Sequence, residues 1–95
     1  MPAYIIADSN ITDPVAYDRY RARVPAAVAA HGGRFLVRGG EVTTLEGDWS
    51  PRRVVIIEFP DVAAAKAFYD SPAYREARKL REGAAHIDMI AVAGA

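Results

Sequence analysis

The sequence contains no cysteine and only two histidines among its 95 residues. Without cysteine, no disulfide can brace the fold, and no thiolate can act as a nucleophile or a metal ligand. His31 and His86 stand far apart, and neither belongs to a His-x-His, His-x-x-x-His or His-x-x-Glu pattern. We therefore expect no metal ion.

Signatures of cofactors and nucleophiles are missing as well. The glycine pairs in HGGR and RGGE do not have the Gly-x-Gly-x-x-Gly or P-loop spacing that holds phosphates. No Gly-x-Ser-x-Gly elbow occurs, and helix capping before Pro72 explains Ser71. We therefore expect no cofactor.

The chain also lacks an excess of charge, because its 12 basic and 12 acidic residues cancel. A neutral domain binds nucleic acid poorly, since phosphate contacts need a surplus of Lys and Arg. No apolar run approaches the roughly 20 residues that span a bilayer, and the start, MPAYIIADSN, is not typical of a signal peptide. These features predict a cytoplasmic protein without a nucleic-acid or membrane partner, and the length predicts one domain over residues 1–95.

Hydrophobic residues make up 52% of the chain, and their spacing predicts the secondary structure. Apolar and β-branched runs predict four strands, at residues 3–7, 34–38, 53–59 and 87–93. The segment EVTTLEG at 41–47 has the composition of an extended chain that continues the second strand. GDWSP after it is typical of a turn.

Two helical regions are predicted between these strands. The pair Asp13-Pro14 predicts a capped start of the first helix, and His31 followed by two glycines predicts its end. Pro25 lies inside this helix, and we expect a kink there. Asp61 predicts the start of the second region, which Ser71-Pro72 should break in two.

The order strand–helix–strand–strand–helix–strand is typical of the ferredoxin-like α+β fold. It predicts a four-stranded antiparallel sheet with the first and third strands in the centre. Because β-α-β crossovers are right-handed, both helical regions should cover the same face of the sheet. The opposite face then has no helix to cover it.

The third strand, RVVIIEF, is apolar on both faces. Alternation places Val55, Ile57 and Phe59 on one face and Val54, Ile56 and Glu58 on the other, and the sequence does not decide which set faces the helices. Exposing two large aliphatic side chains would forfeit roughly 3–6 kcal/mol of burial, a large share of the stability of a small domain. We therefore predict a homodimer through the helix-free face. The alternative is that residues 41–50 fold over that face.

The stretch LEGDWSPRRVVIIEFPDVAAAKAFYDSPAYREARKLREGAA resembles the family called domain of unknown function 1330, and YDRYRARVPAAVAAHGGRFLVRGGEVTTLEG fits the same pattern. The one departure is at Phe68-Tyr69, where the family commonly has an aromatic pair with tryptophan. Members resemble the dimeric α/β barrel superfamily, in which two ferredoxin-like sheets pack face to face. The resemblance implies this fold and a homodimer, but no mechanism, because the family has no agreed reaction.

Tyrosines and arginines are the side chains best suited to a binding site. The candidates for the walls of a cleft between helices and sheet are Tyr20, Tyr69 and Tyr74, with Tyr17 and Trp49 as further ones. The candidate for holding a ligand carboxylate is Arg38, with Arg53 and Arg81 as further ones. Together they predict a site for a small organic anion.

His31 and Glu58 are the candidates for proton transfer. His31 at a helix end is either a capping residue that interacts with the helix dipole or a general base or haem ligand at the cleft. Glu58 ends an otherwise apolar strand. If it is buried there, its pKa should rise unless an arginine pairs with it. A structural Glu–Arg pair is therefore the alternative to a catalytic role.

Three classes of function remain open. The first is a cofactor-independent or substrate-assisted enzyme, as are the small monooxygenases, isomerases and decarboxylases of the architecture that the resemblance implies. The second is a ligand-binding or sensing module without turnover. The third is a structural or stress-related dimer without a ligand. The first needs a carboxylate or histidine with a perturbed pKa in the cleft, the second a cavity with an anchor, and the third a cleft filled by side chains.

Overall fold

A computed structural model describes every residue from Met1 to Ala95. In chain order its elements are β1 (Ala3–Ile11), α1 (Pro14–Ala30), β2 (Arg34–Arg38), β3 (Val54–Phe59), α2 (Val62–Asp70), α3 (Pro72–Lys79) and β4 (Ala85–Ala93). None of the helices is long and apolar enough to cross a membrane.

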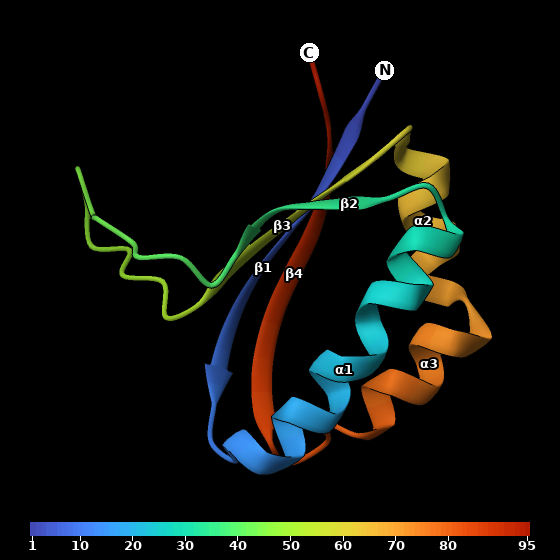
Figure 1. The fold of residues 1–95 in the computed structure, drawn as a ribbon. Coiled ribbons are helices and arrows are strands. Elements are labelled where there is room, and N and C mark those ends of the chain that lie inside the picture. The colour runs from blue at the N-terminus through green and yellow to red at the C-terminus, as the bar shows by residue number, and fades with distance from the viewer.

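The four strands form one sheet in the order β2-β3-β1-β4, and every neighbouring pair is antiparallel. The first and third strands occupy the centre, as predicted. All three helices lie on one side of the sheet (Figure 1). The prediction of a ferredoxin-like α+β fold is therefore confirmed.

Side-chain hydrogen bonds set the starts of the helices. Asp13 and Asp61 cap α1 and α2 by accepting a hydrogen bond from the backbone N–H three residues later. The hydroxyl of Ser71 donates to the carbonyl of Phe68 at 2.7 Å and accepts from the N–H of Tyr74 at 3.2 Å. One serine thus ends α2 and caps α3, which confirms the predicted break.

Strands β1 and β4 extend beyond the apolar runs that predicted them. Their register pairs Ala3 with Ala93 at one end and Ile11 with Ala85 at the other. The polar stretch DSN in β1 has a low strand propensity, so its extended form depends on pairing with β4. Tertiary pairing of this kind leaves no local sequence signal.

The core lies between the helices and the sheet. Ile57 and Phe59 of β3 are buried against the helices, which settles the orientation of that strand. The ring of Phe68 lies 5.2 Å from that of Phe59 and 4.5 Å from that of Tyr74, measured between centroids. A Cβ atom on Gly33 would lie only 2.6 Å from the Phe59 ring, so glycine permits the close approach of this turn to the core.

The opposite face of the sheet has no cover from its own chain. Strand register and alternation place on it the apolar side chains of Tyr4, Ile6, Val54, Ile56, Ile90 and Val92. Ile90 is 60% exposed and Val92 42% exposed. An apolar stripe therefore runs across the centre of the helix-free face.

Residues 39–53 depart from the prediction of an extended segment after β2. They form an irregular loop that projects away from the sheet (Figure 1), with Leu45 93% and Trp49 66% exposed. An extended ribbon would need hydrogen bonds between the two halves of the loop, and Pro51 cannot donate one. The loop also does not fold over the helix-free face, so the predicted alternative cover is absent.

Candidate functional site

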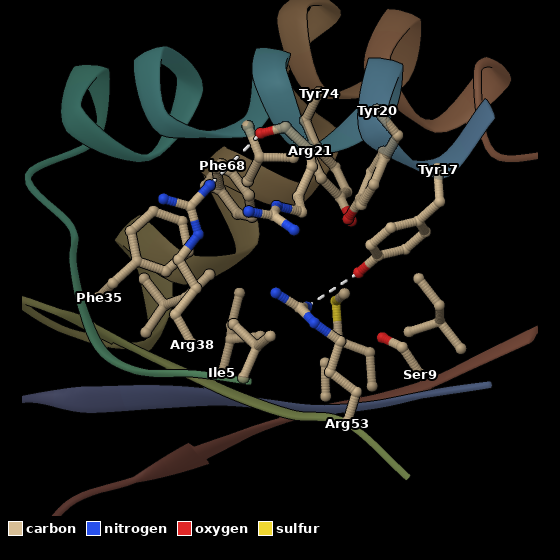
Figure 2. A pocket seen from close by; sticks show the side chains of 16 residues that line it. Ile5, Ser9, Tyr17, Tyr20, Arg21, Phe35, Arg38, Arg53, Phe68 and Tyr74 are labelled. Carbon is tan, nitrogen blue, oxygen red and sulfur yellow. Dashed lines mark hydrogen bonds between the residues drawn. The ribbon is translucent and has the colours of Figure 1, made fainter. Parts of the chain in front are cut away.

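A cavity lies between α1, α3 and the sheet (Figure 2). The cavity volume is about 30 Å³, and the empty space including the open mouth is about 460 Å³. A cavity volume of this size has room for about two waters. An organic ligand must therefore displace side chains at the mouth.

The sheet forms an apolar floor for this cavity. The floor residues are Ile5, Ala7 and Ser9 from β1, Val55 and Ile57 from β3, and Ile87 and Met89 from β4. Ser9 is the only polar residue among them. The floor therefore suits the hydrocarbon part of a ligand.

Three arginines, Arg21, Arg38 and Arg53, line the cavity together with the ring of Tyr17. Nη1 of Arg53 donates a hydrogen bond to the Tyr17 hydroxyl at 3.1 Å. A Cβ atom on Gly39 would lie 2.8 Å from Nε of Arg53. The first glycine of the loop thus leaves room for this guanidinium.

Arg38 contacts α1 at a position where one helical hydrogen bond is missing. The helix itself continues through Pro25. Because Pro25 has no N–H, the carbonyl of Arg21 lacks its usual helical partner. Nη2 of Arg38 donates to that carbonyl at 3.4 Å, as Figure 2 shows. The Arg38 guanidinium also lies 4.5 Å from the centroid of the Phe35 ring. These two contacts place a cation beside the cavity.

Negative charge is absent from the lining of the cavity. Two carboxylates lie near these arginines. Asp8 accepts a hydrogen bond from the backbone N–H of Arg53 at 3.4 Å, and the Asp18 carboxylate lies 3.9 Å from Arg21, with both side chains of that pair at least half exposed. An exposed ion pair of this kind contributes little to stability. The guanidinium groups of Arg38 and Arg53 form no ion pair with the protein.

Two buried tyrosines meet above the floor. The hydroxyls of Tyr20 and Tyr74 lie 2.8 Å apart and share a hydrogen bond. Burial, together with the neighbouring Tyr74, raises the pKa of Tyr20 well above its ordinary value of 10.0. The Arg81 guanidinium lies 5.3 Å from the centroid of the Tyr20 ring, and its Nε is buried without a hydrogen-bond partner. Tyr20 is therefore neutral at physiological pH and lies next to a partly buried cation.

A second hollow lies beside the cavity and shares Ile5, Ile87 and Met89 with it. The volume of this groove is about 310 Å³. Tyr69 lines the groove and not the cavity, and the Arg78 guanidinium stacks on its ring at 4.1 Å. Tyr69 therefore lies outside the cavity, although its ring centroid is 5.7 Å from that of Tyr74.

The two candidates for proton transfer lie outside the cavity. Nδ1 of His31 lies 2.9 Å from the carbonyl oxygen of Ala27 at the end of α1, which matches the capping alternative. Glu58 points to the helix-free face, where its Oε1 accepts a hydrogen bond from Nε of Arg34 at 2.8 Å. Glu58 does not face the cavity, because Ile57 and Phe59 occupy the helix-facing positions of β3, and its pairing with Arg34 matches the structural alternative.

The family model of the domain of unknown function DUF1330 matches residues 2–95. The chain belongs to this family. No curated protein matches the sequence of this DUF1330 chain.

Solved structures of similar fold span nearly the whole DUF1330 chain. RPA0582 from Rhodopseudomonas palustris, a protein of unknown function, is 26% identical, with a TM-score of 0.75 over 99% of this chain and 82% of its own. A dimeric ferredoxin-like protein of unknown function from Jannaschia sp. CCS1 is 16% identical, with a TM-score of 0.66 over 99% and 100%. SnoaB from Streptomyces nogalater, a cofactor-independent oxygenase, is 12% identical, with a TM-score of 0.65 over 99% and 93%. The last two show a shared fold only.

The structure brings together three of the predicted site residues of this DUF1330 protein, namely Tyr20, Arg38 and Tyr74. Tyr17 and Arg53, which were further candidates, also line the cavity. Sequence reasoning missed Arg21, Phe35 and Ser9. Arg21 had a signal, because it lies four residues after Tyr17 and therefore on the same helix face. No group of three or more His, Asp or Glu side chains lies close enough to hold a metal ion.

Proposed function

We propose that this protein binds a small organic anion in the cavity between α1, α3 and the sheet. The observation that carries the proposal is the cluster of three guanidinium groups beside an apolar floor, with no carboxylate among the lining residues. Guanidinium groups bind carboxylates through two parallel hydrogen bonds. A ligand carboxylate would supply the missing negative charge, and its hydrocarbon part would lie on the floor.

We further propose that the protein is cytoplasmic and forms a homodimer through the helix-free face. The apolar stripe of Ile6, Ile56, Ile90 and their neighbours supports this face, because nothing in the chain covers it. Face-to-face packing of two sheets buries such a stripe on both copies at once. The dimeric protein from Jannaschia shares the fold.

Two forms of the proposed function differ in turnover. In the catalytic form the protein is a cofactor-independent enzyme of the monooxygenase, isomerase or decarboxylase type, supported by the fold shared with SnoaB. In the alternative it is a non-catalytic ligand-binding protein or a structural, stress-related dimer, supported by the small cavity volume of about 30 Å³. His31 and Glu58 lie away from the cavity, so a reaction there would depend on the acidity of the ligand itself.

The test is a thermal-shift screen with aromatic and dicarboxylic acids. Arg53→Ala removes a guanidinium from the cavity, and Arg52→Ala removes the neighbouring exposed one as a matched control. A ligand at 100 times its Kd should stabilise the wild type by about 2.7 kcal/mol. It should retain this effect in Arg52→Ala and lose most of it in Arg53→Ala and Arg38→Ala.

If no acid stabilises the wild type, or if Arg52→Ala and Arg53→Ala respond equally, the cavity is not an anion site. For any acid that binds, mass spectrometry of the ligand after incubation in air separates the two forms. A changed ligand mass or isomer would support the enzyme. An unchanged ligand at full recovery would support the binding protein.

A further inference from the structure

We infer that the ligand presents an enol or phenol oxygen to the Tyr20–Tyr74 pair and is bound there as the oxyanion, an inference that rests on the proposed anion site. The ligand then has two polar ends: a carboxylate near Arg38 and Arg53, and the second oxygen at the tyrosines. Its middle lies on the apolar floor (Figure 2).

The hydrogen atoms of the tyrosine pair support this assignment. Two hydroxyls carry two protons, and only one of these lies between the oxygens of Tyr20 and Tyr74. The other polar group beside both hydroxyls is the Arg81 guanidinium, which can only donate hydrogen bonds, so the second proton has no acceptor in the hydrogen bonds of the chain. A buried donor without an acceptor costs about 1–3 kcal/mol. Because both tyrosines line the cavity, the acceptor must come from what the cavity contains.

The charges around the pair select an anion as that acceptor. The titratable groups that face the pair are Tyr17 and Arg21 from α1, Arg38 from β2, Arg53 ahead of β3, Tyr69 from α2, Arg78 from α3 and Arg81 after it. The parts of β1 and β4 that line the cavity contribute none. Every charged group in this set is a cation, and the set contains no carboxylate or imidazole to take a proton.

The acidity of the ligand's hydroxyl group indicates which type of oxygen the tyrosine pair binds. A neutral alcohol would also accept this proton, but it would not neutralise the positive charge of the surrounding guanidinium groups. An enol or phenol is a weak acid, and nearby positive charges and hydrogen-bond donors lower its pKa towards neutrality. Its flat ring or conjugated chain also fits among the tyrosine and phenylalanine rings. The cavity is therefore suited to a ligand that leaves its proton in solvent when it binds.

The test uses 4-hydroxy-3-nitrobenzoate, whose visible absorption reports the phenolate. 3-Nitrobenzoate, which lacks the phenol, serves as the matched probe for carboxylate binding. Absorption is recorded against pH with and without excess protein. Binding should lower the apparent pKa of the phenol by about one to three units, and both probes should raise the Tm of the protein.

Tyr74→Phe and Tyr20→Phe remove one hydroxyl each with little change in shape, and Tyr69→Phe is the control outside the cavity. The first two should abolish at least half of the shift in the phenol pKa, whereas 3-nitrobenzoate, which has no phenol, should still raise the Tm of both variants. Tyr69→Phe should change neither. The Tm of each free variant shows that it is folded.

If 3-nitrobenzoate binds but the phenol titrates as it does in buffer, the inference about the oxyanion is wrong and the proposed anion site stands. If the shift persists in both Tyr20→Phe and Tyr74→Phe, the tyrosine pair is not the binding group. If neither probe binds, the anion site and this inference both fail.

Discussion

The two faces of the sheet hold their arginines in different ways. On the helix-free face Arg34 forms a 2.8 Å ion pair with Glu58. On the helix-covered face the guanidinium groups of Arg38 and Arg53 contact an aromatic ring, a hydroxyl and a carbonyl, but they form no ion pair with a carboxylate. The first arrangement is complete within the chain, whereas the second leaves positive charge uncompensated. Binding is therefore expected where the charge is not neutralised, and an ion pair can serve structure alone.

The largest effect should come from placing an aspartate on each face in turn. Ile57→Asp puts a carboxylate into the core, where the loss of the isoleucine costs about 2–5 kcal/mol and the buried charge costs more. We expect this variant to be unfolded by circular dichroism. Ile56→Asp changes the neighbouring residue on the helix-free face and should remain folded.

Light scattering of Ile56→Asp tests the proposed homodimer. The wild type should have the mass of a dimer and Ile56→Asp that of a monomer, because the charge would be buried between two sheets. A wild type that is monomeric at micromolar concentration would show that the helix-free face does not pair. Unfolding of both variants would contradict the assigned orientation of β3.

A smaller effect is expected from Pro25→Ala on the covered face. Alanine restores the N–H that the carbonyl of Arg21 lacks, and a proline in a helix interior is unfavourable by about 3 kcal/mol. Part of this gain is offset because proline also restricts the unfolded chain, so the free energy of unfolding should rise by about 1–2 kcal/mol in urea titrations.

The same variant should weaken anion binding, because the new N–H competes with Arg38 for the carbonyl. Ala26→Gly, at an exposed position of the same helix, is the control for a change in helix stability alone. Unchanged affinity in Pro25→Ala would show that this carbonyl does not position Arg38.

The smallest effect concerns alkaline pH. The pKa of Tyr20 is raised in the folded state from its ordinary value of 10.0. Above about pH 10 the unfolded chain therefore loses a proton that the folded chain retains. Stability from this tyrosine is complete below that pH and falls by up to about 1.4 kcal/mol per pH unit above it. Chemical denaturation from pH 9 to 11 should show this slope in the wild type and a flatter one in Tyr20→Phe, whereas equal slopes would contradict it.

The sequence predicted those features of the fold that depend on contacts between residues close together in the chain. Asp13, Asp61 and Ser71 cap helices through bonds to residues three positions away, so their signals lie within short windows. The central position of β3 followed from its apolar run. The polar residues 8–10 are extended because they pair with β4. No short window of sequence around them indicates this pairing.

The candidate site was predicted only in part, for a related reason. Arg38 and Tyr74 were identified by residue type, but the orientation of Glu58 depends on which face of β3 carries the larger apolar side chains into the core. The role of Arg21 depends on Pro25 and on Arg38, which lies 17 residues away. Such arrangements form only when α1 packs on the sheet, so the sequence alone could not separate the cavity residues from Glu58, His31 and Tyr69.

The exposed loop that begins after Arg38 and ends at Arg53 has a spectroscopic consequence. It carries Trp49, the only tryptophan of the chain, with 66% of its surface already exposed to water. Tryptophan emission should therefore change little when the protein unfolds and is a poor signal for stability. Because the loop lies between Arg38 and Arg53, which both line the cavity, a blue shift of this emission would report burial of Trp49 at the cavity mouth.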